Sequence, residues 1–400
     1  MTAPVEKPAT PPLPRRSTGS IVGQAWAILA IPLIAIVLAL VVGALVIILS
    51  SSLVPHKGFD VTLPLAAYGA LLAGATGFDP GNGSLFTVDA IVGSLVFAAP
   101  LALAGLGVAV GFKAGLFNIG AQGQFLMGAL GAVAVGGALH SSPAIVAIPA
   151  AIVIGALVGA VWGGIVGALK AISGAHEVVT TIMMNYIAFA VLSWVVSGPL
   201  KQANSLQPIT ADVGNAALPI LIGQNGHLGV FIAFLAVPII WFLLYRTTRG
   251  FEIRTVGANL DAARYAGMRP RWITVLTMGL AGGLAGLAGA GNMLGINHQM
   301  SATFNTTVGF DAITIALLGR SHPVGVFFSA LFFGAMRQGA GAMQVQAGLP
   351  TELVDVIEAV LLFFLVVGPI IGARLRLRGV KSGLGDADTL TVAIVGEAAH

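Results

Sequence analysis

Long apolar stretches, separated by short polar ones, follow one another along the chain. The first covers about 24 residues from Trp26 to Leu49, enough to cross the core of a bilayer and too long for the apolar part of a signal peptide. Further apolar stretches cover 88–112, 117–139, 143–169, 178–198, 228–245, 273–295, 308–319, 323–343 and 352–371. The pattern predicts an all-α polytopic membrane protein with about ten transmembrane segments.

The composition agrees with this class of protein. Of the 400 residues, 57% are hydrophobic and 8% are charged, whereas roughly 25% of residues are charged in soluble domains. Cysteine is absent, which excludes disulfides, thiolate metal sites and cysteine nucleophiles. The seven histidines form no H-x-x-x-H pair, so we predict neither a metal site nor a catalytic residue.

The positions of the basic residues indicate the orientation in the membrane. With the N-terminus in the cytosol, all Lys and Arg residues except Lys57, Lys201 and Arg337 fall on the cytosolic side. The positive-inside rule therefore predicts that both termini are cytosolic. We predict a disordered tail over 1–20, rich in Pro, Thr and Ser, a transmembrane domain over 21–372 and a cytosolic tail over 373–400.

Two further stretches indicate packing and no chemistry. Residues 65–76 are too few to cross a bilayer and are predicted to form an interfacial helix on the outer surface. Glycines recur every four residues in the fourth apolar stretch, at Gly155, Gly159, Gly163 and Gly167. Such a stripe lets two helix backbones approach closely.

Polar amides begin the third apolar stretch, which reads GLFNIGAQGQFLMGAL from residue 115. Asn118, Gln122 and Gln124 must face protein or a wet cavity, because an unsatisfied amide in hydrocarbon costs a few kcal/mol. Hydrogen bonds between helices and the lining of a substrate path are both open interpretations. The same two interpretations apply to Asn185, in the fifth stretch, and to Asn292, in the seventh.

The eighth stretch, 308–319, is short and carries Asp311 near its start. An ionisable residue in a span suggests function, although a helix N-terminus or an ion pair would explain it equally well. Short or interrupted segments in both halves of a transporter point to a midplane binding site, and we predict two such helices. The third and eighth stretches run in opposite directions, and Phe117-Asn118 matches Phe310-Asp311 in kind, which fits an inverted repeat.

Three acids share one face of the last predicted helix: Glu352, Asp355 and Glu358. They lie in its first two turns, where the helix dipole and the outer water favour carboxylates, and we interpret them in this way. A proton relay through Asp355 and Glu358 is the alternative.

The longest internal loop, 246–272, is rich in arginine and contains a predicted short helix from Asn259 to Ala266. A basic loop could lie on anionic headgroups, but the small residues and charged edges of this helix favour docking in a groove of another protein. The chain contains no G-x-x-x-x-G-K-[ST] motif, so any motor driven by ATP would be a partner protein.

Four motifs in this chain resemble those of a known family. They read GLFNIGAQGQ, EVVTTIMMNYIA, RGFEIRTVGANLDAARYAGM and TVGFDAITIALLGRSHPVG. Together they resemble the permease subunits of bacterial ABC importers in the superfamily of ribose and branched-chain amino-acid permeases. The resemblance covers the chain from residue 85 to 372 and is strongest to the nucleoside branch, whose solute-binding lipoproteins belong to the basic membrane protein family.

The resemblance implies a permease in the bacterial plasma (inner) membrane that translocates a nucleoside or a related small polar solute by alternating access. It implies three partners: an ABC ATPase that binds Mg-ATP, a second homologous permease subunit that makes a heterodimer, and an extracellular solute-binding lipoprotein. No cofactor, enzymatic reaction or nucleic acid is expected for this chain itself.

The polar pattern and the resemblance together assign residues to two sites. The predicted substrate path consists of Phe117, Asn118, Gln122, Gln124, Asn185, Asn292, Phe310 and Asp311. Phenylalanine offers a stacking face for a base, and amides offer hydrogen bonds to base edges or ribose hydroxyls. The predicted ATPase-coupling residues are Glu252, Arg254, Gly257, Asn259, Ala262, Ala263 and Gly267.

Three alternative functions remain open at this point. An importer permease for a simple sugar or an amino acid would use the same amides in a wet cavity. An ion-coupled secondary transporter would use Asp311, Asp355 or Glu358 to carry protons or sodium. A membrane scaffold or receptor would leave the two short spans unexplained.

Overall fold

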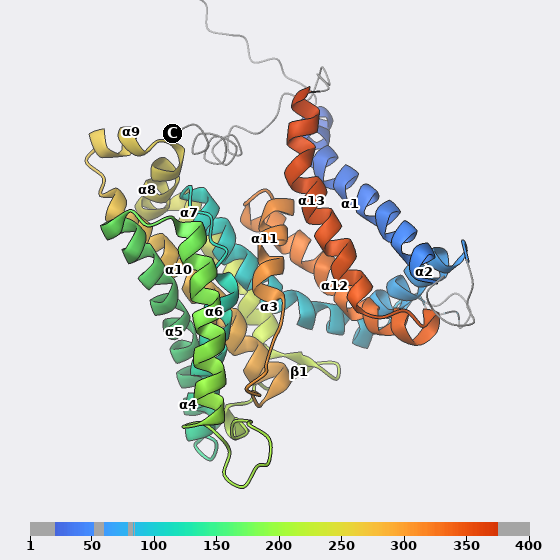
Figure 1. Cartoon of the computed structure of the whole chain (residues 1–400), viewed down its shortest axis with the longest axis horizontal. Coiled ribbons are helices and arrows are strands. Elements are labelled where there is room, and N and C mark those ends of the chain that lie inside the picture. The colour runs from blue at the N-terminus through green and yellow to red at the C-terminus, as the bar shows by residue number, and fades with distance from the viewer. Residues whose placement is uncertain (1–20, 52–59, 79–82, 84, 375–400) are drawn as a thin grey trace, which may run out of the picture.

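The structure, a computed structural model, describes residues 21–51, 60–78, 83 and 85–374. This part of the chain is a bundle of helices with one small hairpin (Figure 1). The predicted tail over 1–20, Lys57 and residues 375–400 of the predicted C-terminal tail lie outside the described residues.

Each predicted apolar stretch contains a helix, so these predictions are confirmed as secondary structure. The helices are α1 (Ile21–Ser51), α2 (Leu63–Thr76), α3 (Val88–Lys113), α4 (Ala121–Ala138), α5 (Ala144–Ser173), α6 (Glu177–Ser197), α7 (Leu228–Arg246), α8 (Thr248–Ala258), α9 (Leu260–Tyr265), α10 (Pro270–Asn292), α11 (Val308–Leu318), α12 (Pro323–Ala347) and α13 (Glu352–Arg374). The smaller elements are the 3-10 turn η1 (Gly214–Ala216), the strands β1 (Ile220–Ile222) and β2 (Gly226–His227), and the π-helix η2 (Met293–Asn297).

Six of the described helices are long and apolar enough to cross a membrane: α1, α3, α5, α6, α7 and α10. By contrast, α11 has 11 residues. Its rise is about 16 Å, roughly half of the bilayer core. The third apolar stretch becomes helical only at Ala121, where α4 begins. The short helix predicted over 308–319 is therefore present as α11, whereas α4 is one unbroken helix of 18 residues. The count of ten spans and the inverted repeat stay predictions.

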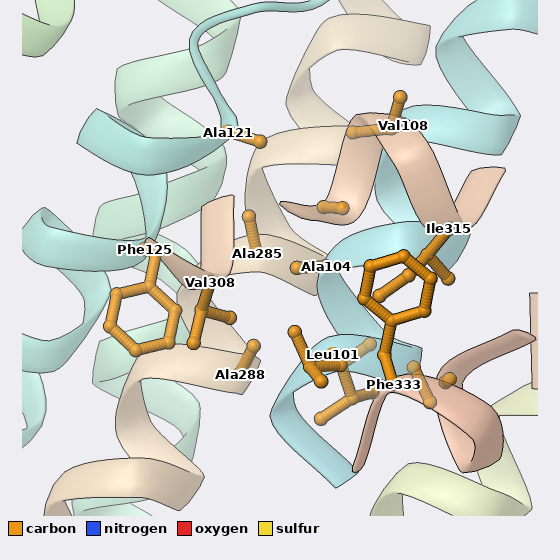
Figure 2. Packing of buried hydrophobic residues seen from close by; sticks show 14 of the residues in the cluster. Leu101, Ala104, Val108, Ala121, Phe125, Ala285, Ala288, Val308, Ile315 and Phe333 are labelled. Carbon is orange, nitrogen blue, oxygen red and sulfur yellow. The ribbon is translucent and has the colours of Figure 1, made fainter. Parts of the chain in front are cut away.

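The centre of the bundle is α3. Of its span, 89% is buried, and it packs against α7, α10, α11 and α12. Figure 2 shows Leu101, Ala104 and Val108 of this helix among apolar side chains of α10, α11 and α12. A helix that is apolar on all sides is suited to such a position, because it has no face to offer to water.

The predicted glycine stripe lies between α5 and α10, which have the most extensive contact of any two elements. A Cβ atom on Gly159 would lie 2.5 Å from the carbonyl oxygen of Gly282 and 2.6 Å from Cα of Gly286. These distances leave no room for a side chain. The packing role of the stripe is confirmed, and α10 contributes a second set of glycines that the sequence analysis did not single out.

The two ends of the bundle differ. At one end, which we call the loop end, α8 packs on the end of α7, and α9 follows it (Figure 1). At the opposite end, the hairpin end, β1 and β2 pair in antiparallel fashion, and Thr210 N donates to Met300 O at 2.9 Å. The sequence analysis predicted one short helix in the 246–272 loop, and the structure adds α8 before it.

The predicted interfacial helix is α2, which packs against α12. A Cβ atom on Gly74 would lie 2.5 Å from Cβ of Ala342, so the two helices touch closely. The helix is confirmed, and its place at the membrane surface stays a prediction. A second pair, α1 with α13, lies next to it (Figure 1).

Candidate substrate path and coupling loop

Two amides before and within the first turn of α4 are buried and bonded to each other. Asn118 Nδ2 donates to Gln124 Oε1 at 2.9 Å, and Gln124 Nε2 donates back to Asn118 Oδ1 at 3.2 Å. The same Asn118 oxygen accepts from Gly120 N at 3.0 Å. Both side chains are at most 1% exposed. The pair thus fixes the non-helical segment before α4 without help from solvent.

Gln122 joins α4 to the start of α11. Its Nε2 donates to Thr306 O at 2.6 Å, and its Oε1 accepts from Gly309 N at 2.9 Å. Gly309 is needed for this contact, because a Cβ atom there would overlap the backbone of Gln122. α4 and the start of α11 therefore meet at a single amide side chain.

Asn185 of α6 binds the same region. Its Oδ1 accepts from Gly123 N at 2.8 Å, and its Nδ2 donates to Ile119 O at 3.0 Å. Four amide side chains, which we call the central amides, thus have both oxygen and nitrogen bonded to protein: Asn118, Gln122, Gln124 and Asn185. This is expected for hydrogen bonds between helices. In this conformation none of them offers its hydrogen bonds to a solute, and their place in a substrate path stays a prediction.

The other predicted path residues differ in exposure. Phe117 is half-buried, with its ring centroid 5.2 Å from that of Phe112. Phe310 on α11 is 42% exposed. Asn292 accepts from Asn297 Nδ2 at 2.6 Å and lines a cavity of about 10 Å³. That volume holds about one water molecule, so Asn292 does not face a space of nucleoside size.

Asp311 belongs to a cluster of charges that the sequence analysis did not predict. Nη2 of Arg337 on α12 lies 2.6 Å from Asp311 Oδ2, 3.3 Å from Asp355 Oδ1 and 3.2 Å from Glu358 Oε2. Thr307 Oγ1 donates to Asp311 at 2.8 Å and accepts from Arg337 at 2.6 Å. We call these five residues the Arg337 cluster.

One prediction about this cluster is wrong. Arg337, predicted on the outer side, lies within α12 with a side chain that is 21% exposed, and its side of the membrane stays a prediction. Glu358 was interpreted as a carboxylate near water, but its side chain is 5% exposed, whereas Asp355 at 52% fits that interpretation. A basic residue inside one predicted span, followed by acids in the next, was the signal for an ion pair.

The cluster brings three carboxylates to one guanidinium. Taking an ion out of water costs several kcal/mol, which only close and well-bonded partners offset. Arg337 is the shared partner, so the burial of Asp311 and Glu358 depends on it. The cluster also ties α11, α12 and α13 together.

The predicted short helix of the coupling loop is confirmed as α9. Asn259 Oδ1 accepts from Ala262 N at 2.9 Å and caps the helix, and Gly267 follows with a φ of +79°, which glycine adopts without strain. Ala263 is buried, while the other residues of α9 are exposed, up to 94% for Tyr265. The helix thus presents most of its surface to a partner.

The preceding helix, α8, is anchored to the bundle. Arg254 donates to the last turn of α7. Glu252 forms an ion pair with Arg249 at 2.9 Å within α8 itself. Gly257 packs on the backbone of Lys113, where a Cβ atom would overlap the carbonyl oxygen. Of the predicted coupling residues, Arg254 and Gly257 therefore anchor α8, whereas Asn259, Ala262 and Gly267 are exposed in and beside α9.

The family model described as "Branched-chain amino acid transport system / permease component" matches residues 90–366. The chain belongs to this permease family. The permease is 38% identical over 341 residues to the guanosine ABC transporter permease protein NupP of Bacillus subtilis (strain 168). The aligned residues make up 84% of the permease and 92% of NupP.

Two further relatives are similar over nearly their whole length. The glucose ABC transporter permease protein TsgB13 of Haloferax volcanii is 33% identical, with 88% of the permease and 90% of TsgB13 covered. The nucleoside ABC transporter permease protein NupB of Lactococcus lactis subsp. cremoris is also 33% identical, with 88% of the permease and 94% of NupB covered. No solved structure matches the permease.

The expected family is confirmed by these comparisons. The permease is a multi-pass membrane subunit of an ABC transporter, and members of this family are transporter subunits and not enzymes. The resemblance of the four motifs to permease subunits was therefore correct, including the likeness to nucleoside permeases.

Replacing Gln122 by leucine is expected to lower the free energy of unfolding by about 2 kcal/mol, because Gly309 N–H and Thr306 C=O would stay buried without their partner. The melting temperature of the purified permease measures this effect. Gln207→Leu, the same change at an exposed side chain, should leave it unchanged. An unchanged melting temperature for Gln122→Leu, with uptake per folded molecule reduced, would instead assign the amide to the substrate path.

Proposed function

We propose that the permease is the membrane-spanning subunit of an ATP-driven importer that carries nucleosides across the bacterial inner membrane by alternating access. The likeness to the guanosine permease NupP, over 84% of the permease, carries this proposal, and the likeness to NupB supports it. A simple sugar is the second candidate because TsgB13 is named for glucose, and an amino acid the third because of the family description.

The substrate path of this proposal runs past the contact between α4 and α11. In the described conformation Gln122 is bonded to α11, and the other central amides are bonded to protein. Alternating access requires a second conformation in which the two helix starts separate and the amides bind water and solute instead. Phe310, which is 42% exposed, and Phe117 offer stacking faces for a base.

The energy source of this proposal is a separate ATPase that binds Mg-ATP. Its docking element on the permease is α9, whose residues are exposed except Ala263. A short helix of this kind fits a groove in a partner protein, which is the mode of docking expected for a coupling helix. The loop end is then cytosolic, which agrees with its many arginines, and both termini lie in the cytosol.

The complete transporter of this proposal contains a second, homologous permease and an extracellular solute-binding lipoprotein. The two permeases form a heterodimer that encloses the path. Phe310 and Asp355 remain partly exposed in the single chain, as residues facing such a shared path would be.

Uptake of radiolabelled guanosine into proteoliposomes tests the proposal. The permease is co-reconstituted with the ATPase, second permease and lipoprotein encoded by neighbouring genes. We expect uptake that requires Mg-ATP on the side of the loop end, persists with an uncoupler at constant ATP, and is competed by other nucleosides. Loss of uptake when only the proton gradient is collapsed would support an ion-coupled carrier that uses the Arg337 cluster. Competition by glucose would support a simple sugar as the substrate.

A further inference from the structure

We propose that Arg254 of α8, Tyr245 of α7 and His322 before α12 form a relay that transmits movement of the coupling loop to α11. The proposal rests on the proposed function, in which this loop receives the ATPase. It gives Tyr245 and His322 a positioning role in coupling, because neither side chain needs to touch the ATPase or the solute.

The first contact of the relay joins α8 to α7. The guanidinium carbon of Arg254 lies 5.1 Å from the centroid of the Tyr245 ring, within the range of a cation–π interaction. Arg254 Nε also donates to Leu244 O at 3.0 Å. Since both contacts are to the last turn of α7, a displacement of α8 acts on Tyr245.

The second contact joins α7 to the connection between α11 and α12. The rings of Tyr245 and His322 form a tilted stack, with centroids 5.4 Å apart and planes at 34°. Burial lowers the pKa of His322, and the nearby charge of Lys113 lowers it further. The lowered pKa favours the neutral imidazole, which can stack on Tyr245 near the cation Lys113 without repulsion.

The connection after α11 is tight, so that His322 and α11 move together. Arg320 and Ser321 both have a φ of +52°, which turns the chain sharply. Ser321 N donates to Ala316 O at 2.7 Å, and His322 N donates to Gly319 O at 3.1 Å. These bonds attach the turn to the last residues of α11.

The other end of α11 carries the contacts of the candidate path. Gly309 is bonded to Gln122 of α4, and Asp311 is bonded to Arg337. Because α11 has 11 residues, a push at its last turn is carried to both contacts along one short rigid helix. Gly257 of α8 also packs on the connection that leads into α4, so the coupling loop reaches both sides of the contact between α4 and α11.

The experiment measures solute molecules transported per ATP hydrolysed in proteoliposomes with the complete transporter. Tyr245→Leu is expected to lower this ratio about fivefold or more, in the usual range of coupling between sites. Tyr245→Phe keeps the ring and should keep the ratio. Tyr186→Leu, the same change at a ring that is 67% exposed, is the matched control and should also keep it. Loss of folded protein alone would reduce transport and hydrolysis together and leave the ratio unchanged.

Two further variants decide the outcome if Tyr245→Leu does not fold. Arg254→Met keeps the aliphatic stem but loses the cation, and His322→Leu loses the stacked ring, so both should lower the ratio. If the three residues act in one relay, the double variant with Arg254→Met and Tyr245→Leu should have nearly the same ratio as Tyr245→Leu alone. Wild-type ratios in His322→Leu and Arg254→Met would overturn the relay while leaving the importer intact. A wild-type transporter without ATP-dependent uptake would overturn the proposed function and the relay with it.

Discussion

Replacing Arg337 by alanine is expected to lower the free energy of unfolding of the permease by about 3–5 kcal/mol. Among the described residues, Arg337 supplies the guanidinium that faces Asp311, Asp355 and Glu358, and its removal leaves two of these carboxylates buried without their partner. The melting temperature in detergent and the yield of folded protein from the membrane measure the effect.

Two controls separate this effect from a general sensitivity to lost arginines. Arg249→Ala breaks an ion pair in which the arginine side chain is 58% exposed, and such pairs contribute about 0–1 kcal/mol. Arg337→Met combined with Asp311→Asn and Glu358→Gln removes the buried charges together and should recover much of the lost stability. If Arg337→Ala alone melts like the wild type, the cluster does not hold α11, α12 and α13 together.

Replacing Gly159 by leucine is expected to destabilise the permease by about 3 kcal/mol, because the new side chain forces α5 away from α10. Even a Cβ atom would lie 2.5 Å from Gly282 O. Gly164→Leu is the matched control on the same helix, since a Cβ atom there has nothing within 4 Å. The control should melt at the wild-type temperature or above it, because glycine is the weaker helix former.

The outcome for the two glycines also tests the contact itself. If the two helices are in contact in the membrane as described, the variants must differ in melting temperature. Equal melting temperatures for Gly159→Leu and Gly164→Leu would contradict the close approach of α5 and α10.

The helices were predictable because a membrane-spanning helix is a local property of the sequence. The predicted stretch 178–198 corresponds to α6 (Glu177–Ser197), and 228–245 corresponds to α7 (Leu228–Arg246). The stripe with Gly159 was predictable for the same reason, since a repeat of four places its members on one helix face. α8 was missed because its hydrophobic residues are few and interrupted by charges.

The partners of the polar residues were not predictable from one sequence. Gln122 bonds to Gly309, 187 positions further on, and Arg337 bonds to Asp311, 26 positions before it. The cost of burying a polar group requires that a partner exists, but it does not say which residue that partner is. Two interpretations of the amides therefore stayed open from the sequence, and the ion pairs of Arg337 were missed, because only the arrangement of the helices brings these partners together.

The contact between α5 and α10 has a consequence for how this protein can change in evolution. At Gly159, Gly282 and Gly286, backbone meets backbone, and each neighbour of a Cβ atom would be another main-chain atom. Every single-nucleotide change that removes a glycine from the protein introduces a residue with a Cβ atom or a stop. No such step is neutral at these three positions, and no second change nearby can make room, because a main chain cannot be made smaller. Divergence of this helix pair is therefore confined to positions other than these three glycines.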